Sequence, residues 1–265
     1  MAQAQAVGPP HRLGFLETLR RDRWWVEPTL LFLGLTLFFG YLAVSAFLDE
    51  WAFKEGPYLS PVFESGPFMF IERLEEPFSS WFLSPAFVIL WVPAGFRITC
   101  YYFRQAYYRS GFLSPPACAI GDARRLYAGE SRFPLILQNA HRFFMYAALI
   151  LIWFQWATAI KSFHHPDEGW GIGLGSVILI ADSILLSFYL FSCHALRHMI
   201  GGRLDCFSCS WRNLMQKKAW NWVSRLNVNH AVWAWSSLFS VLITDIYIRL
   251  VANGHITDPN TWSSF

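Results

Sequence analysis

The chain has 265 residues, of which 54% are hydrophobic and only 15% are charged, and its formal net charge is +3. Soluble domains carry about 25% charged residues, so the composition excludes an ordinary soluble protein. The small net charge, with no basic stripe, argues against a nucleic-acid partner. The apolar residues fall into blocks close to the ~20 residues with which a helix crosses a bilayer. We therefore expect an all-α integral membrane protein, a bundle of five transmembrane helices.

The elements expected along the chain are a short polar segment followed by one membrane domain. Residues 1–27 predict a cytoplasmic N-terminal segment, which ends in arginines and Trp24-Trp25, a pattern typical of a membrane interface. Residues 28–265 are expected to form the five-helix membrane domain, with proline-containing polar loops between the early spans. The expected spans are 28–47, 81–103, 141–160, 171–198 and 230–251.

Lysine and arginine predict the orientation of the bundle. They gather in the N-terminal segment and in the loops 104–140 and 199–228, whereas the opposite side carries little beyond Lys54, Arg73 and Lys161. Because cytoplasmic loops are enriched in these residues, the N-terminus is expected inside and the C-terminus outside.

Two acidic residues lie within the predicted spans. Asp182 is interpreted either as a proton relay, because intramembrane acids are functional candidates, or as the partner of a neighbouring hydroxyl group. Asp245, four residues before Arg249, is expected to form an ion pair with it at the outer end of the last span.

The stretch 193–209 concentrates residues that can bind a metal. His194 and His198 are four residues apart and share one face of a helix, which the following Gly-Gly pair is expected to end. Cys206 and Cys209 then form a Cys-x-x-Cys pair. Two imidazoles and two thiols within so short a span are the ligand count of a metal site.

The predicted topology brings further histidines to the same membrane depth. His141 opens the third span and His230 opens the fifth, both on the cytoplasmic side. The five cysteines are odd in number and lie in or near the spans, so we expect reduced, ligand-capable thiols and no disulfide framework. Cys100 and Cys193 are interpreted as small packing residues within helices.

Three kinds of metal centre are compatible with these residues. A structural zinc ion takes two Cys and two His. A b-type haem takes two axial histidines from facing helices, which His141, His198 and His230 could supply. A Rieske-type [2Fe-2S] centre also takes two Cys and two His, although the spacing here is not that of soluble Rieske domains. The Cys-x-x-Cys pair favours the cluster or zinc, because haem b has no use for two thiols.

Three runs of the sequence resemble a known family. Residues 133–142, 194–209 and 229–235 look like the membrane-anchor subunit of a succinate:quinone oxidoreductase (succinate dehydrogenase, respiratory complex II) of the actinobacterial kind. The resemblance implies a multi-pass protein of the bacterial cytoplasmic membrane, with flavoprotein and iron–sulfur subunits docked on its cytoplasmic face. The succinate site then lies on a partner chain, and electrons pass from succinate to a quinone.

The resemblance also bears on the metal. Anchors with two haems take histidines from four helices at two depths, whereas the first two spans here have none. The kind of anchor that this chain resembles carries a Rieske-type cluster in place of haem. The favoured ligands are His194, His198, Cys206 and Cys209, with His141 and His230 as alternates. The alternatives are an anchor that carries haem b, and an anchor without a redox role in which a zinc ion is purely structural.

A quinone site is expected beside this centre, for menaquinone or ubiquinone. Reduction of a quinone consumes two protons, so a donor group is needed near its oxygens. The candidates are His141, Arg142, Arg97 and His230, with Tyr101 as a possible wall of the site. No residue of this chain is expected to be catalytic toward succinate.

Overall fold

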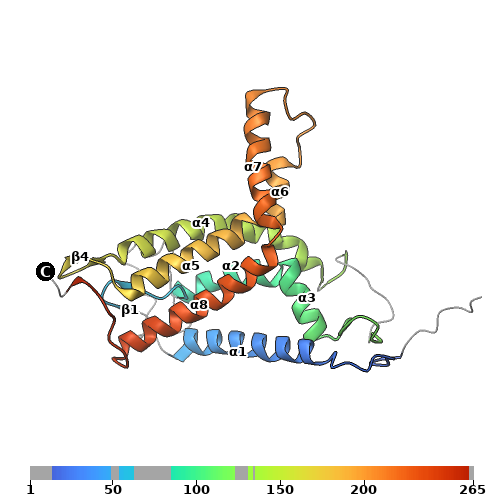
Figure 1. Cartoon of the computed structure of the whole chain (residues 1–265), viewed down its shortest axis with the longest axis horizontal. Helices are drawn as coiled ribbons and strands as arrows, with labels where there is room; N and C mark the ends of the chain where they lie inside the picture. Colours follow the sequence, from blue (N-terminus) through green and yellow to red (C-terminus); the bar gives the residue numbers. More distant parts are fainter. Residues whose placement is uncertain (1–13, 49–53, 63–84, 123–130, 134, 263–265) are drawn as a thin grey trace, which may run out of the picture.

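The computed structural model describes residues 14–48, 54–62, 85–122, 131–133 and 135–262 as an all-helical bundle with two small hairpins. Long helices run side by side through the molecule, and a separate pair of helices stands off one end (Figure 1). The helices are α1 Val26–Leu48, α2 Pro85–Ile98, α3 Tyr101–Ser110, η5 Leu135–Ala140, α4 His141–Lys161, α5 Leu174–Phe191, α6 His194–Gly201, α7 Trp211–Asn227 and α8 His230–Ala252.

Within the described residues, four helices are long and apolar enough to cross a membrane. They are Val26–Ser45, Ile136–Lys161, Leu174–Phe191 and His230–Ala252. α5 packs against both α4 and α8, while α2 packs on α4 and α1 on α3. Buried apolar side chains from all of these helices form one continuous core, in which Met145 and Leu238 are fully buried.

Two of the expected spans are each divided into two helices. The expected span 81–103 is wrong as a single helix, because α2 ends at Ile98 and α3 begins at Tyr101; residues 81–84 lie outside the described part. The expected span 171–198 is likewise divided into α5 and α6. At both breaks a cysteine, Cys100 or Cys193, has extended backbone (ψ of 135° and 136°) and so redirects the chain.

Polar contacts close the opposite end of the bundle. Two antiparallel hairpins lie there, β1 Lys54–Glu55 with β2 Tyr58–Leu59 and β3 His164–His165 with β4 Gly169–Trp170. The expected ion pair is confirmed, with Arg249 Nε 3.0 Å from Asp245 Oδ2. Asp245 is fully buried and also accepts a hydrogen bond from Tyr41 of α1. This carboxyl group therefore ties α1 to α8.

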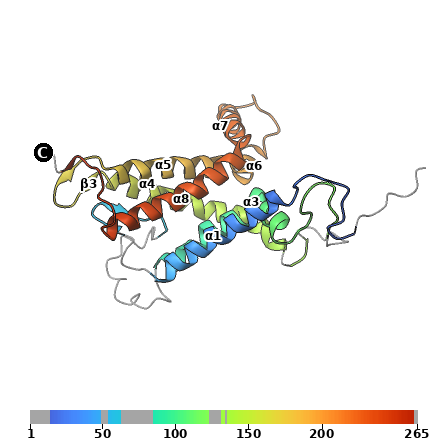
Figure 2. The same ribbon diagram turned by 60° about the horizontal axis from the view of Figure 1, so that its bottom comes forward.

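The N-terminal segment lies beside the loop that follows α3 (Figure 2). Leu16 N donates to Gly121 O at 3.0 Å, and the Thr18 hydroxyl donates to Ala119 O at 2.8 Å. The hairpin of α6 and α7 stands off the same half of the molecule. The segments rich in Lys and Arg thus share one end of the bundle.

Candidate metal centre and adjoining cavity

Two cysteines and two histidines meet at the ends of four helices. Cys100 and Cys193 occupy the two helix breaks, while His141 and His230 are the first residues of α4 and α8. His141 Nε2 lies 3.2 Å from Cys193 Sγ, and His230 Nε2 lies 3.6 Å from Cys100 Sγ. Each thiol therefore faces the Nε2 atom of one imidazole.

Hydroxyl groups hold the other nitrogen of each ring. Thr99 Oγ1 lies 2.9 Å from His141 Nδ1, and Ser192 Oγ lies 2.6 Å from His230 Nδ1. Each hydroxyl already donates its own hydrogen to a backbone carbonyl, Thr99 to that of Gly95 and Ser192 to that of Tyr189. A hydroxyl has one hydrogen to donate, so it must accept from the imidazole. Both rings then carry their proton on Nδ1, which leaves Nε2 free to bind a metal.

Cys100, Cys193, His141 and His230, the four donors of the candidate metal centre, are shielded from solvent by aromatic rings. Cys100, Cys193 and His230 are each no more than 2% exposed. The ring of Phe96 stacks on His141 with centroids 4.7 Å apart, and Tyr189 stacks on His230 at 5.2 Å. Burial raises the pKa of the Cys193 thiol to about 11, so binding of a metal there would release the thiol proton.

This donor set fits a Rieske-type cluster. Two thiols and two imidazoles are the ligands of such a centre, and the hydroxyl contacts supply the orientation that metal-binding histidines need. Among the described residues, no group of three or more His, Cys, Asp or Glu converges as it would around a single ion. The donors meet instead as two mixed pairs, each of one Cys and one His, and the two pairs together supply the two Cys and two His that such a cluster takes.

The residues favoured from sequence are placed differently. His194 lies beside the four donors, its ring centroid 6.0 Å from that of His230. His198 Nδ1 instead lies 3.3 Å from Arg142 Nη2 on an exposed surface. Partial burial, followed by the charge of Arg197, lowers the pKa of His194.

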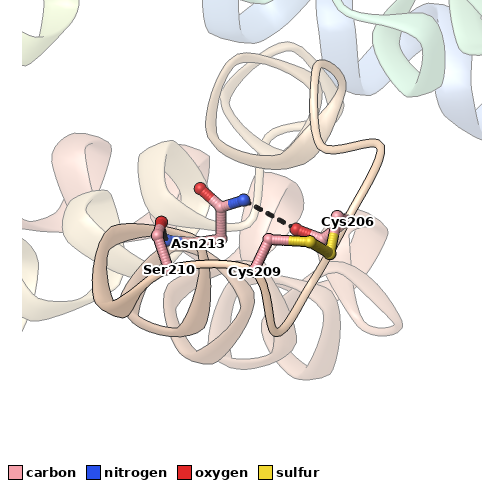
Figure 3. Close-up of a disulfide and its surroundings, with 4 residues drawn as sticks. All are labelled: Cys206, Cys209, Ser210 and Asn213. Atoms are coloured by element: carbon pink, nitrogen blue, oxygen red, sulfur yellow. Dashed lines mark hydrogen bonds between the residues drawn. A yellow bond between two sulfur atoms is a disulfide. The ribbon is translucent and has the colours of Figure 1, made fainter.

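The Cys-x-x-Cys pair forms a disulfide in the loop between α6 and α7 (Figure 3). The Cα atoms of Cys206 and Cys209 are 5.7 Å apart, and Asn213 Nδ2 donates to Cys206 O at 2.8 Å. Ser210 caps α7 by accepting from Asn213 N. The expectation of free, ligand-capable thiols at this pair is therefore corrected, because each sulfur is bonded to the other.

A cavity of about 490 Å³ adjoins the four donors. Among the described residues its walls come from α1, α2, α4, α5, α8 and residues 61–62, and these are apolar except at Arg97, Gln155 and Tyr189. Phe96 and Tyr189 line this cavity and also stack on the two histidines. One aromatic ring thus separates each imidazole from the cavity.

The expected quinone residues fall into separate groups. Arg97 lines the cavity, is 8% exposed and donates to Ala234 O at 3.1 Å and to Ser237 Oγ at 3.2 Å. Its guanidinium carbon lies 4.8 Å from the centroid of the Tyr189 ring. His141 and His230 belong to the four donors, Arg142 contacts His198, and Tyr101 is 57% exposed.

Sequence reasoning missed the two cysteines that the structure brings together. Cys100 and Cys193 each follow a hydroxyl residue, in the dipeptides Thr99-Cys100 and Ser192-Cys193. Side chains of Ser and Thr can bond to nearby backbone and compete with a helix, so this repeated pair was the signal for a helix break at a cysteine.

Comparison with known proteins gives a consistent answer. The family described as actinobacterial succinate dehydrogenase subunit SdhC matches residues 26–254. A chain of the Mycobacterium smegmatis Sdh1 complex in the apo form is similar in structure, with a TM-score of 0.81 and 42% sequence identity. That similarity covers 96% of this chain and 98% of the other. The curated proteins contain no match. This chain belongs to the family of actinobacterial SdhC subunits, the membrane subunits of succinate dehydrogenase.

Proposed function

We propose that this anchor subunit passes electrons from a docked iron–sulfur subunit to a membrane quinone, through a [2Fe-2S] centre held by Cys100, Cys193, His141 and His230. The observation that carries the proposal is the pairing of each thiol with the Nε2 atom of an imidazole whose Nδ1 is held by a hydroxyl group. This set replaces the one favoured from sequence and includes both of its alternate histidines.

The chain's own residues would prepare the centre in three ways. Thr99 and Ser192 fix the protonation of the rings, while Phe96 and Tyr189 exclude water and separate the centre from the cavity. Arg97 adds a buried positive charge over Tyr189. When bound, a histidine-ligated cluster supplies one-electron transfer at about −150 to +300 mV, against about −400 mV for plant-type ferredoxins. That range suits delivery to a quinone.

The soluble partners would dock on the basic end of the molecule. The hairpin of α6 and α7 and the loop before α7 carry Arg203, Arg212, Lys217, Lys218 and Arg225. Because basic residues mark the cytoplasmic side of a membrane protein, this end and the N-terminus would face the cytoplasm of a bacterium. Flavoprotein and iron–sulfur subunits would bind there. Oxidation of succinate to fumarate releases two electrons and two protons, and reduction of menaquinone or ubiquinone takes up two of each.

Spectroscopy of the purified complex tests the ligand set. Replacement of Cys193 by Ser should abolish the low-temperature paramagnetic resonance signal of the histidine-ligated centre, together with quinone reduction. Oxidation of succinate with an artificial acceptor should survive, because that site is on a partner. Replacement of the exposed Cys118 by Ser is the matched control and should leave the resonance signal and quinone reduction unchanged.

Three other outcomes would contradict the assignment. Loss of the signal in Cys206→Ser but not in Cys193→Ser would return the centre to His194, His198, Cys206 and Cys209. Haem bands in the optical spectrum would assign the histidines to haem b. Elemental analysis that found zinc in place of iron would show a structural zinc site without a redox role.

A further inference from the structure

A buried carboxyl group lies directly behind the wall of the cavity. Asp182 of α5 is fully buried and accepts hydrogen bonds from Gln155 Nε2 at 3.1 Å and from the Ser240 hydroxyl. Within the described part of the chain no basic side chain forms an ion pair with it, unlike Asp245, which Arg249 contacts at 3.0 Å. The electron route described above makes no use of Asp182, so its burial within a span needs another reason.

Gln155 connects this carboxyl group to the cavity. Its side chain lines the cavity from α4, yet the residue is only 5% exposed. The amide nitrogen of Gln155 donates to Asp182, whereas the amide oxygen has no hydrogen-bond partner among the described residues. Nor is that oxygen among the fully buried side-chain atoms that lack a partner, so it is open to the cavity. The group that Gln155 offers to a molecule in the cavity is therefore a hydrogen-bond acceptor.

The rest of the cavity fits an amphipathic ring. Its volume is in the range of about 300–1,000 Å³ typical of small-molecule sites, and its lining is apolar apart from Arg97, Gln155 and Tyr189. Arg97 can only donate hydrogen bonds. The Tyr189 hydroxyl is itself closed off from the cavity. Arg97 and Gln155 therefore present one obligate donor and one oriented acceptor.

We propose that Asp182 orients Gln155 so that its amide oxygen accepts a hydrogen bond from a hydroxyl group of the reduced quinone held in this cavity. The inference rests on the proposed function, in which a quinone is the electron acceptor. The oxygens of a quinone accept hydrogen bonds only, whereas a quinol also donates, so Gln155 distinguishes the two forms. Arg97 donates to either form. A bond that forms only as the ring gains protons raises kcat and leaves the KM for quinone nearly unchanged.

The test uses the whole complex and a short-chain naphthoquinone with its quinol. In Gln155→Leu, the inhibition constant of the quinol should rise about tenfold and kcat should fall by a similar factor, which corresponds to one hydrogen bond. The KM for the quinone should stay within about twofold. Asp182→Asn keeps the size of the side chain but has one acceptor oxygen for two donors, so the same changes should appear at about threefold.

A matched control separates recognition from packing. Trp156 Nε1 donates to Ser187 Oγ at 2.9 Å between the same two helices, and neither residue lines the cavity. Ser187→Ala should leave kcat, KM and the quinol inhibition constant unchanged. If Gln155→Leu fails to assemble, as judged by succinate oxidation with an artificial acceptor, Asp182→Asn carries the test alone.

Several results would overturn the inference. Equal rises in the quinone KM and the quinol inhibition constant would show that Gln155 lines the cavity without distinguishing the two forms. Unchanged constants would show that Gln155 does not contact the bound ring. The same effects in Ser187→Ala would make the role structural. A lipid acyl chain as the sole occupant, found by mass spectrometry of the purified complex, would also refute it. Failure of the proposed electron route would show itself separately, as absence of the centre's resonance signal in the unmodified complex.

Discussion

Two hydroxyl groups determine which nitrogen of each candidate ligand is free. Thr99 and Ser192 use their own hydrogens on backbone carbonyls, so they can only accept from the Nδ1 atoms of His141 and His230. Sequence reasoning located both histidines at one membrane depth, but it could not find the hydroxyl contacts. They join residues 42 and 38 positions apart, and such pairs become visible only once the helices are placed.

Removal of these hydroxyl groups should weaken metal binding and leave the fold intact. Loss of such an orienting partner lowers metal affinity by about 10–100-fold, so we expect Thr99→Val and Ser192→Ala to reduce the iron content of the purified complex. Ser183→Ala is the control, because within the described part of the chain that hydroxyl bonds only to Leu179 O of α5. Full iron content in both test variants would show that the hydroxyls do not orient ligands.

At the scale of elements, the apolar blocks predicted the long helices but not their ends. α1, α4 and α8 begin and end within a few residues of the expected spans, because about 20 predominantly apolar residues suffice to define them. The breaks at Cys100 and Cys193 contain neither Gly nor Pro, the residues that most often interrupt a helix. Tertiary contacts to the imidazoles stabilise these breaks, which is why the candidate centre was only half predicted.

The crossing of α2 and α4 offers a prediction about helix spacing. A Cβ atom on Gly95 would overlap the ring of Phe144, so this glycine lets α2 approach α4 closely. Gly95→Val should push the helices apart and displace Thr99 from His141, and we expect a large loss of the centre's resonance signal per complex.

Gly34→Val is the matched control for this crossing. Gly34 also lies inside a membrane helix, and a Cβ atom there meets no described residue within 4 Å. Both variants carry the same cost of a β-branched residue in a helix, so only the contact differs. An equal signal in the two variants would mean that the close approach of α2 and α4 does not hold the site.

At the scale of the whole molecule, charge and polarity divide the two ends. The basic N-terminal segment, the α3 loop and the α6–α7 hairpin share one end, while the β-hairpins and residues 253–262 lie at the other. The positions of Lys and Arg in the sequence were enough to predict that the basic segments share one end. That prediction needs only the order of spans and loops along the chain and no knowledge of side-chain packing. The same distribution predicts the orientation in the membrane, which can be measured directly.

Labelling of cysteines in spheroplasts would establish that orientation. Asp167 lies exposed in the turn between β3 and β4, whereas Cys118 lies exposed at the basic end. A membrane-impermeant maleimide should modify Asp167→Cys in intact spheroplasts. Mass spectrometry should find Cys118 modified only after the membrane is opened and the soluble subunits are stripped. Modification of Cys118 in intact spheroplasts would place the basic end outside, and partners in the cytoplasm could not then reach the hairpin or deliver electrons at the end where the four donors lie.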